Sequence, residues 1–157
     1  MAIDQSHLSL LARFDVSSAF DMVDHEILLR RLQLSFGLSG IPLRWFKSYL
    51  SDRSQMVVLG DSRSQWVEIK LGVPQGSVLG PILYVLFTAD IPSLFAKHGA
   101  TGHLYADNAQ AFVHGLPTEQ LSLVRSIDLL THDLHLWMST NRLCLSADKT
   151  QLIWFGD

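Results

Sequence analysis

The chain has 157 residues, of which 48% are hydrophobic, which is enough for one domain with a real core and too few for two. Its formal net charge is −3, so charge alone argues against the basic face that supplies most of a nucleic-acid binder's affinity. The single cysteine, Cys144, excludes an internal disulfide framework and fits a reducing compartment.

The first third of the chain predicts a strand and two helices. Residues 1–7 have neither the cationic start nor the apolar stretch of a secretory signal, so we expect an intracellular protein. Residues 8–16 are typical of a buried strand. A helix is expected from the acidic cap Asp24 to Gly37, and a second from about Pro42 onward. The side chains expected to face the core are Ile27, Leu28, Leu32, Leu34, Leu43, Trp45, Phe46 and Leu50.

The middle of the chain predicts a hairpin and an apolar helix. Residues 55–60 and 65–71 have strand-like composition, and residues 60–63 form the turn between them. Residues 77–89 are the most apolar helix candidate. Their apolar run is much shorter than the ~20 residues that a membrane span needs. We therefore expect a buried helix and no membrane partner.

The last third predicts a second hairpin, a long helix and two strands. Pro92 and Gly99 break the chain before a strand at 101–106, and a strand at 109–114 follows almost at once, so Asp107-Asn108 forms a hairpin tip. Residues 118–138 repeat apolar positions at helical spacing. Strands at 142–146 and 151–155 complete an α+β fold with helices on one face of an antiparallel sheet. The side chains expected to be buried by the long helix are Leu121, Val124, Ile127, Leu130, Leu134 and Trp137.

Two acids at strand ends suggest a metal-dependent nucleotidyl-transfer site. Asp15 ends the first strand, Asp107 lies at the hairpin tip, and both are expected at the same edge of the sheet. Phosphoryl transfer with two metals needs carboxylates from adjacent strands that converge on ions roughly 4 Å apart. Alone, Asp15 is better explained as an acid that caps a turn, and Asp107-Asn108 as a hairpin turn, a role that is compatible with metal binding. Likewise, the loop 72–77 alone would be an ordinary Pro-Gly loop.

Four sequence blocks occur in a recognisable order. They are Phe14 to Asp21 with Val23-Asp24-His25, Gly72 to Pro81, Tyr105 to Gln110, and Trp137-Met138 through Asn141 to Asp148-Lys149-Thr150. Together they resemble the palm of a reverse transcriptase, and more narrowly that of a non-LTR (LINE-type) retrotransposon. The resemblance implies RNA-directed DNA polymerisation with two Mg²⁺ ions, or Mn²⁺. It also implies an RNA template, a DNA primer and a dNTP as partners, and target-primed synthesis in the nucleus.

The resemblance implies a role for individual residues. Asp15 and Asp107 would ligate the metal ions together with the backbone of Val16, and Lys149 would approach the phosphates and protonate the leaving pyrophosphate. Phe20 would exclude a ribose 2′-OH. The catalytic positions are thus Asp15, Asp107, Asn108 and Lys149, and the nucleotide-binding positions are Val16, Phe20, Gln75, Gly76 and Tyr105.

The chain also departs from the family pattern. Asn108 replaces the second acid of Tyr-Ala-Asp-Asp, and an amide oxygen coordinates a hard cation more weakly than a carboxylate does. Ser146 stands where an Asn is usual. We expect most of the fingers and thumb to be missing from this single palm domain over residues 1–157. By itself the chain would then bind template and primer weakly and be inactive.

Other interpretations remain open. The chain could be a catalytically dead palm remnant that only binds or scaffolds, or that has no retained role; Asn108 favours this. An unrelated α+β protein would need four coincidental motifs. Lys149 is equally explained as a solvated loop lysine. His132 and His135 are three residues apart on the long helix, but no cysteine or acid completes a metal set with them.

Overall fold

The structure is a computed structural model and describes residues 7–156. These residues fall into two compact units. The sheet unit comprises residues 7–19 and 88–156, and the helical unit is Phe20–Phe87.

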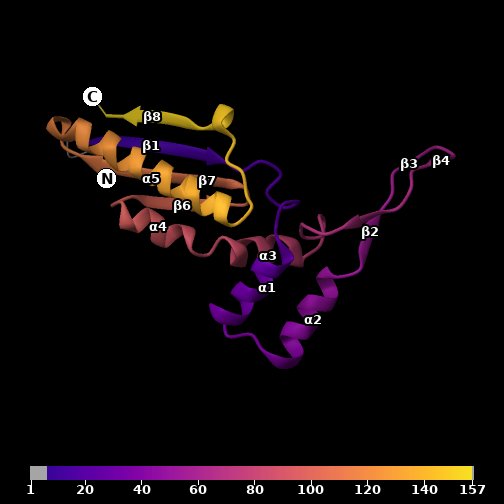
Figure 1. The fold of residues 1–157 in the computed structure, drawn as a ribbon. Coiled ribbons are helices and arrows are strands. Elements are labelled where there is room, and N and C mark those ends of the chain that lie inside the picture. The colour runs from indigo at the N-terminus through magenta and orange to yellow at the C-terminus, as the bar shows by residue number, and fades with distance from the viewer. Residues whose placement is uncertain (1–6, 157) are drawn as a thin grey trace. The chain divides into compact units, whose positions relative to one another are not determined.

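The sheet unit is built on an antiparallel sheet (Figure 1). Its strand order is β6 (Thr101–Tyr105), β7 (Asn108–Gly115), β1 (Leu8–Asp15) and β8 (Gln151–Phe155). Helix α5 (Gln120–Thr140) packs on β1 and β7, and helix α4 (Ile91–Lys97) packs on β6 and on α5. This arrangement confirms the predicted α+β fold with helices on one face of the sheet.

The alternation of side chains along β1 explains how one face of the sheet is covered. Leu10, Ala12 and Phe14 are buried, whereas Arg13 is exposed and Asp15 is partly exposed. Successive side chains of a strand point to opposite faces. Arg13 and Asp15 therefore share the face opposite to the one that buries Leu10, Ala12 and Phe14.

Helix α5 confirms the predicted amphipathic helix but not all of its buried side chains. Leu121 is 87% exposed and Val124 is also exposed, so both predictions are wrong. At about 3.6 residues per turn, Leu123 shares the face of Ile127, whereas Val124 lies at its margin and Leu121 on the opposite side. The buried side chains of α5 are Leu123, Ile127, Leu130, Leu134 and Met138.

The predicted strand at 142–146 is wrong. Leu145 makes a single isolated bridge with Val16, and Arg142 has a positive φ of 60°. The segment pairs antiparallel with residues 15–17 only, where β1 ends, and does not continue along the strand. Its backbone is held there because Ser17 N–H donates to the Cys144 carbonyl and Ser146 N–H donates to the Asp15 carbonyl, both at 2.9 Å. The short 3₁₀ helix η3 (Ala147–Lys149) follows.

The helix α4 was not predicted. Pro92 indicates a break in the sequence, but it lies in the first turn of α4, where proline costs no hydrogen bond. Gly99, with φ +70°, comes after the end of the helix. The two residues therefore bracket a helix. A second short helix, η2 (Pro117–Glu119), precedes α5.

Gly102 allows close approach of α4 to the sheet, and Gly102→Ala is expected to cost about 1–3 kcal/mol of unfolding free energy. An added Cβ would meet the Phe95 ring and lie 2.7 Å from the Gln110 carbonyl oxygen. Phe95 is only 1% exposed, so its ring has little room to move. Urea unfolding would measure the loss. The neighbouring exposed change Thr101→Ala is the control and should stay within about 0.5 kcal/mol of the wild type.

Asp133 ties α5 to the end of α4. Its Oδ2 accepts a hydrogen bond from Lys97 Nζ at 2.6 Å and lies 2.9 Å from His98 Nε2. The hydrogen bond from Lys97, and then the one from His98, lower the pKa of Asp133 below its ordinary value. Such a carboxyl stabilises the folded chain above its unfolded pKa, and this stabilisation is lost as the pH falls through the lower folded pKa.

We expect Asp133→Asn to lower the thermal unfolding temperature slightly at neutral pH, because the interaction is largely at the surface. The difference from wild type should shrink as the pH falls through the ordinary Asp range. Thermal unfolding followed from neutral pH to about pH 2 measures this. Asp128→Asn, on the exposed face of the same helix, serves as the control. A difference that is the same at every pH would mean that the charge of Asp133 is not its cause.

The helical unit packs α1 (His25–Leu34) against both α2 (Gly40–Leu50) and α3 (Leu79–Phe87) (Figure 1). Asp24 caps α1 as predicted, because its side chain accepts from the Ile27 N–H at 2.9 Å. The buried side chains of these three helices include Leu28, Leu32, Leu50, Leu83, Tyr84 and Phe87.

Several buried positions predicted for this unit are wrong. Leu34 is 69% exposed, because α1 ends there and not at Gly37. Trp45 is also exposed, and its ring stacks on that of Tyr49 at 5.4 Å. Helix α3 is buried on one face only, since Ile82 is exposed while its neighbour Leu83 is buried. A helix that is apolar all round thus has one uncovered side here.

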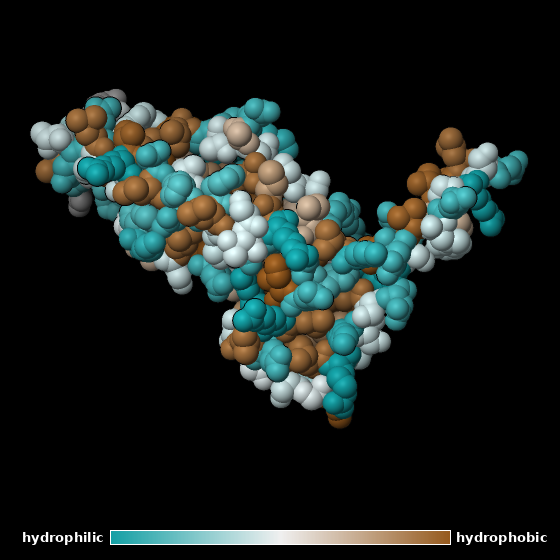
Figure 2. Space-filling view, viewed as in Figure 1, coloured by the Kyte–Doolittle hydropathy of each residue, from teal (hydrophilic) through white to brown (hydrophobic). Residues whose placement is uncertain are grey.

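The predicted hairpin is confirmed with shorter strands. β2 (Arg53–Gln55) pairs with β5 (Val67–Ile69), and β3 (Val58–Leu59) pairs with β4 (Ser62–Arg63). The ladder is interrupted where Val57 N–H donates to the Ser64 side chain. Figure 2 shows hydrophobic residues gathered towards the far end of this hairpin, where Val57, Val58 and Leu59 are exposed.

Within the described residues, Leu79–Lys97 is long and apolar enough to cross a membrane by length and composition alone. In the structure this stretch contains two helices, α3 and α4, with a turn at residues 88–90 between them. The composition is weak evidence for a span, because core helices have the same length and hydrophobicity.

Candidate active site

The sheet brings the backbones of the two predicted acids together. Asp15 ends β1 and lies opposite Asn108 in the register, and the Val16 N–H donates to the Asp107 carbonyl at 3.2 Å. The predicted position of both acids at one edge of the sheet is therefore observed. The hairpin tip is Ala106-Asp107 and not Asp107-Asn108, because Asn108 already pairs as the first residue of β7.

The turn between β6 and β7 is unusual in its backbone. Ala106 has a positive φ of 52°, a region that residues with a Cβ rarely occupy. Such conformations persist only where surrounding structure holds them. Here the ladder of β6 and β7 closes directly on both sides of Ala106 and Asp107. The turn thus presents Asp107 in a defined position at the sheet edge.

Lys149 is a counterion of Asp15 in the sheet unit. Lys149 Nζ lies 3.0 Å from Asp15 Oδ2. Helix η3 carries the lysine, and the Ser146 N–H bond to the Asp15 carbonyl anchors the segment before it. The side chain of Asp15 is 17% exposed and that of Lys149 is 67% exposed. A predicted loop lysine is thus placed directly at the first acid.

Asn108 contacts both Asp107 and Arg13, a residue that sequence reasoning missed. Asn108 Nδ2 lies 3.3 Å from Asp107 Oδ1, and Arg13 Nη2 lies 3.3 Å from Asn108 Oδ1. Arg13 stands two residues before Asp15 on β1, so the period of the strand places both on one face. That spacing was the signal available in the sequence.

Two other predicted positions of the sheet unit differ in exposure. Tyr105 ends β6 opposite Asn108, and its side chain is exposed. Val16 is buried at 3% exposure, so its contribution to any metal or nucleotide would come from its main chain.

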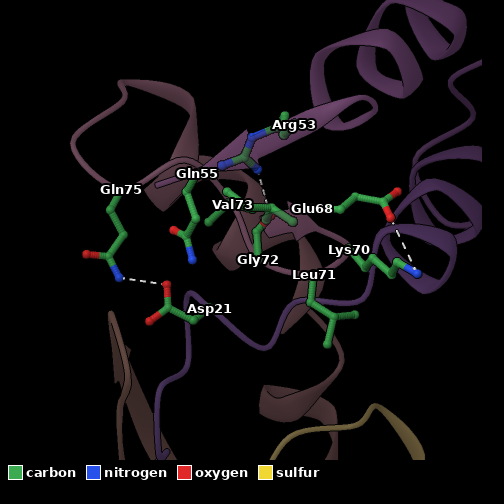
Figure 3. Close-up of a pocket in the computed structure, with 10 residues that line it drawn as sticks. Asp21, Arg53, Gln55, Glu68, Lys70, Leu71, Gly72, Val73 and Gln75 are labelled. Carbon is green, nitrogen blue, oxygen red and sulfur yellow. Dashed lines mark hydrogen bonds and ion pairs between the residues drawn. The ribbon is translucent and has the colours of Figure 1, made fainter. Parts of the chain in front are cut away.

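The helical unit holds the remaining predicted nucleotide-binding residues, and it brings them together. Phe20, Gln75 and Gly76 line one cavity of about 380 Å³. The Phe20 ring lies 4.9 Å from that of Tyr84. Gln75 Nε2 donates to Asp21 Oδ1 at 2.8 Å (Figure 3), so its amide is oriented by the block that contains Phe20.

Gly72, the first residue of the second sequence block, is hydrogen-bonded to the first block. Its N–H donates to the Val23 carbonyl at 2.8 Å, and its own carbonyl lies 2.8 Å from His25 Nε2 and accepts from Arg53 at 3.1 Å. Figure 3 shows the Arg53 bond at a larger cavity of about 810 Å³ in this unit. Gly72 has φ +85°, and a Cβ there would lie 2.9 Å from the Asp21 backbone. Glycine is therefore required at this position.

The oxygen ligands at the sheet edge are few but suitable for a hard cation. Within residues 7–156 no group of three or more His, Cys, Asp or Glu side chains gathers into a metal site. Asp15 and Asp107 instead supply two carboxylates from adjoining positions of the backbone. Mg²⁺ is commonly held by one or two carboxylates, with waters and substrate phosphates completing its octahedron. The donor set therefore fits Mg²⁺ in kind.

Comparison with known proteins defines the family. Residues 2–154 match the model of reverse transcriptase (RNA-dependent DNA polymerase), and the chain belongs to this family. Members of the family use divalent metal ions. The resemblance found in the four sequence blocks is therefore confirmed.

Similar curated proteins come from mobile elements of Drosophila. The probable RNA-directed DNA polymerase from transposon BS of Drosophila melanogaster is 40% identical over 63% of this chain and 11% of its own length. The RNA-directed DNA polymerase from mobile element jockey of Drosophila funebris is 37% identical over 90% of this chain and 16% of its own length. The chain thus spans a small part of these relatives.

Solved structures confirm the fold. Apo telomerase from Candida tropicalis, truncated from its C-terminal domain, superposes with a TM-score of 0.71 at 13% identity, over 96% of this chain and 31% of that one. Telomerase from Candida albicans, in complex with a fragment of telomeric RNA, gives a TM-score of 0.67 at 15% identity, over 92% of this chain and 28% of that one. At such identities the likeness shows the fold alone.

Proposed function

We propose that this chain is the nucleotidyl-transfer region of an RNA-directed DNA polymerase from a non-LTR mobile element. The observation that carries the proposal is the placement of Asp15 at the end of β1 and of Asp107 in the turn that leads into the neighbouring strand β7, with the Val16 N–H bonded to the Asp107 carbonyl. The family match over residues 2–154 and the mobile-element relatives support it.

In this proposal Asp15, Asp107 and the Val16 carbonyl hold two Mg²⁺ ions, or Mn²⁺. When bound, the ions activate the primer 3′-OH and neutralise charge that develops on the α-phosphate. The 3′-OH loses its proton to water and its oxygen bonds to the α-phosphorus, while the bond from that phosphorus to the bridging oxygen breaks and pyrophosphate leaves. Lys149, released from Asp15, donates a proton to the departing pyrophosphate.

Each unit carries some of the predicted nucleotide-binding residues. Phe20, Gln75 and Gly76 line one cavity, which supports a shared role in holding the sugar and base of the incoming dNTP. The contact of Phe20 with Tyr84 would prevent the Phe20 ring from moving to make room for a ribose 2′-OH. Tyr105, exposed at the end of β6, would contact the primer end.

The partners are an RNA template and a DNA primer. The RNA complex of the structurally similar Candida albicans telomerase supports a nucleic-acid partner. The net charge of −3 indicates that this chain by itself binds nucleic acid weakly. Target-primed synthesis would take place in the nucleus, which stays a prediction.

Primer extension on an RNA template tests the proposal. Because the chain spans 16% or less of the relatives it matches, residues 1–157 would replace the matching segment of a complete related enzyme. We expect dNTP incorporation by this graft with Mg²⁺ or Mn²⁺. Incorporation that appears only after Asn108→Asp would instead support the catalytically dead remnant that Asn108 suggests. If neither the unaltered graft nor its Asn108→Asp variant incorporates dNTP while the recipient enzyme is active, the proposed function is contradicted.

A further inference from the structure

The orientation of the Asn108 amide follows from the chemistry of its two neighbours. Its Oδ1 lies 3.3 Å from Arg13 Nη2, and its Nδ2 lies 3.3 Å from Asp107 Oδ1. A guanidinium can only donate hydrogen bonds, and an ionised carboxylate can only accept them. The reversed amide would place donor against donor and acceptor against acceptor. The assignment of the oxygen to Arg13 is therefore determined by the network.

The register of the sheet makes Asn108 a suitable partner for Arg13. Across the ladders of β1, Arg13 lies opposite Gln110 on β7 and Gln151 on β8, neither of which is charged. Asn108, two residues before Gln110, projects on the same face of the sheet. The Arg13 side chain can therefore reach towards the site edge, where it contacts the Asn108 oxygen.

This arrangement turns the hydrogen-bond donors of Asn108 towards the predicted metal ligand. A metal ligand must offer an oxygen lone pair, but the Asn108 oxygen faces a guanidinium, whose positive charge opposes a cation there. The amide N–H instead bonds Asp107 Oδ1 and restricts the rotation of that carboxylate. Outer hydrogen bonds of this kind orient metal ligands. Oδ2 of Asp107 remains free of this bond.

We propose that Asn108 is a positioning residue for Asp107, that Arg13 orients it, and that Asn108 is not itself a metal ligand. The inference rests on the proposed function, because it concerns the acid assigned to metal binding there. It gives the departure from the family's second acid a structural role. It also gives Arg13 a part in the site.

A double-mutant cycle on metal affinity tests the proposal. The chain and its variants Arg13→Met, Asn108→Leu and the double variant would be titrated with Mn²⁺ and followed by electron paramagnetic resonance. Loss of the Arg13 charge near a cation site should by itself tighten binding equally in both backgrounds. The cycle removes this common effect and leaves the coupling between the two side chains.

The sign of the coupling separates positioning from ligation. Arg13→Met changes the Mn²⁺ affinity in two backgrounds, the chain that retains Asn108 and the chain with Asn108→Leu. If Asn108 positions Asp107, the gain in affinity should be smaller in the chain that retains Asn108, by about twofold or more. If Asn108 were a metal ligand, Arg13→Met would free its oxygen, and the gain in Mn²⁺ affinity would be larger in the chain that retains Asn108. That result, or no coupling, would overturn the inference alone. Absence of any saturable Mn²⁺ binding in the wild type would refute the proposed metal site and the inference with it.

The chain without metal provides a second readout. The side-chain amide resonances of Asn108 in a ¹⁵N–¹H spectrum should shift in Arg13→Met. The control Arg125→Met removes an equal charge from an exposed position on α5 and should leave them in place. Unchanged Asn108 resonances in Arg13→Met would overturn the proposal. Equal thermal unfolding of Arg13→Met and Arg125→Met would show that the fold is not the cause.

Discussion

Replacing Asp15 with Asn is expected to reduce single-nucleotide incorporation by the grafted enzyme by at least about 10³-fold. The change preserves the shape of the side chain and removes the charge that would hold the metal ions. Several kcal/mol of transition-state stabilisation depend on that charge, and each 1.4 kcal/mol or so is a tenfold change in rate. Single-turnover extension of a primer on an RNA template measures the loss.

The control for this prediction is Asp128→Asn, which removes an equal charge from an exposed position on α5. It should incorporate nucleotide at the wild-type rate. Circular dichroism of the Asp15→Asn chain should be unchanged, because the acid lies at the end of β1 and not in the core. Incorporation within tenfold of the wild-type rate would exclude Asp15 as an essential metal ligand.

Gly72→Ala is expected to destabilise the helical unit by about 3 kcal/mol. The positive φ of +85° costs a residue with a Cβ about 1–2 kcal/mol, and the new Cβ would lie 2.9 Å from backbone atoms of Asp21, which cannot yield without moving the first block. Unfolding in urea measures the change. Because Gly72 also holds the loop that carries Gln75, we expect nucleotide incorporation by the grafted enzyme to fall as well.

Gly60→Ala is the matched control, because Gly60 has φ +58° but no atom within 4 Å of the position that a Cβ would take. It should cost only the backbone strain, about 1–2 kcal/mol. Equal losses in the two variants would mean that the close approach of Gly72 to Asp21 adds nothing.

The parts of the fold that were predicted correctly rest on local signals. The apolar residues of the segment 8–16 and the closely spaced strands around Asp107 are enough to place Asp15 at the end of a strand and Asp107 at a hairpin tip. Asp24 as the cap of α1 follows from residue type and position alone. These signals are local, so tertiary packing did not alter them.

The failures arise where packing or register decides. Residues 142–146 have strand composition, yet they pair with residues 15–17 through one isolated bridge only and form no strand. The contact of Arg13 with Asn108 joins residues that are far apart in the chain. A single sequence contains no signal that would indicate such a contact.

Mn²⁺ titration of the 157-residue chain, compared with Asp15→Asn and Asp107→Asn, decides whether these two acids hold a metal site together. We expect each substitution to weaken the same saturable binding by about tenfold or more, and Asp128→Asn to leave it unchanged. Mn²⁺ affinity that survives both substitutions would contradict a metal site at the end of β1.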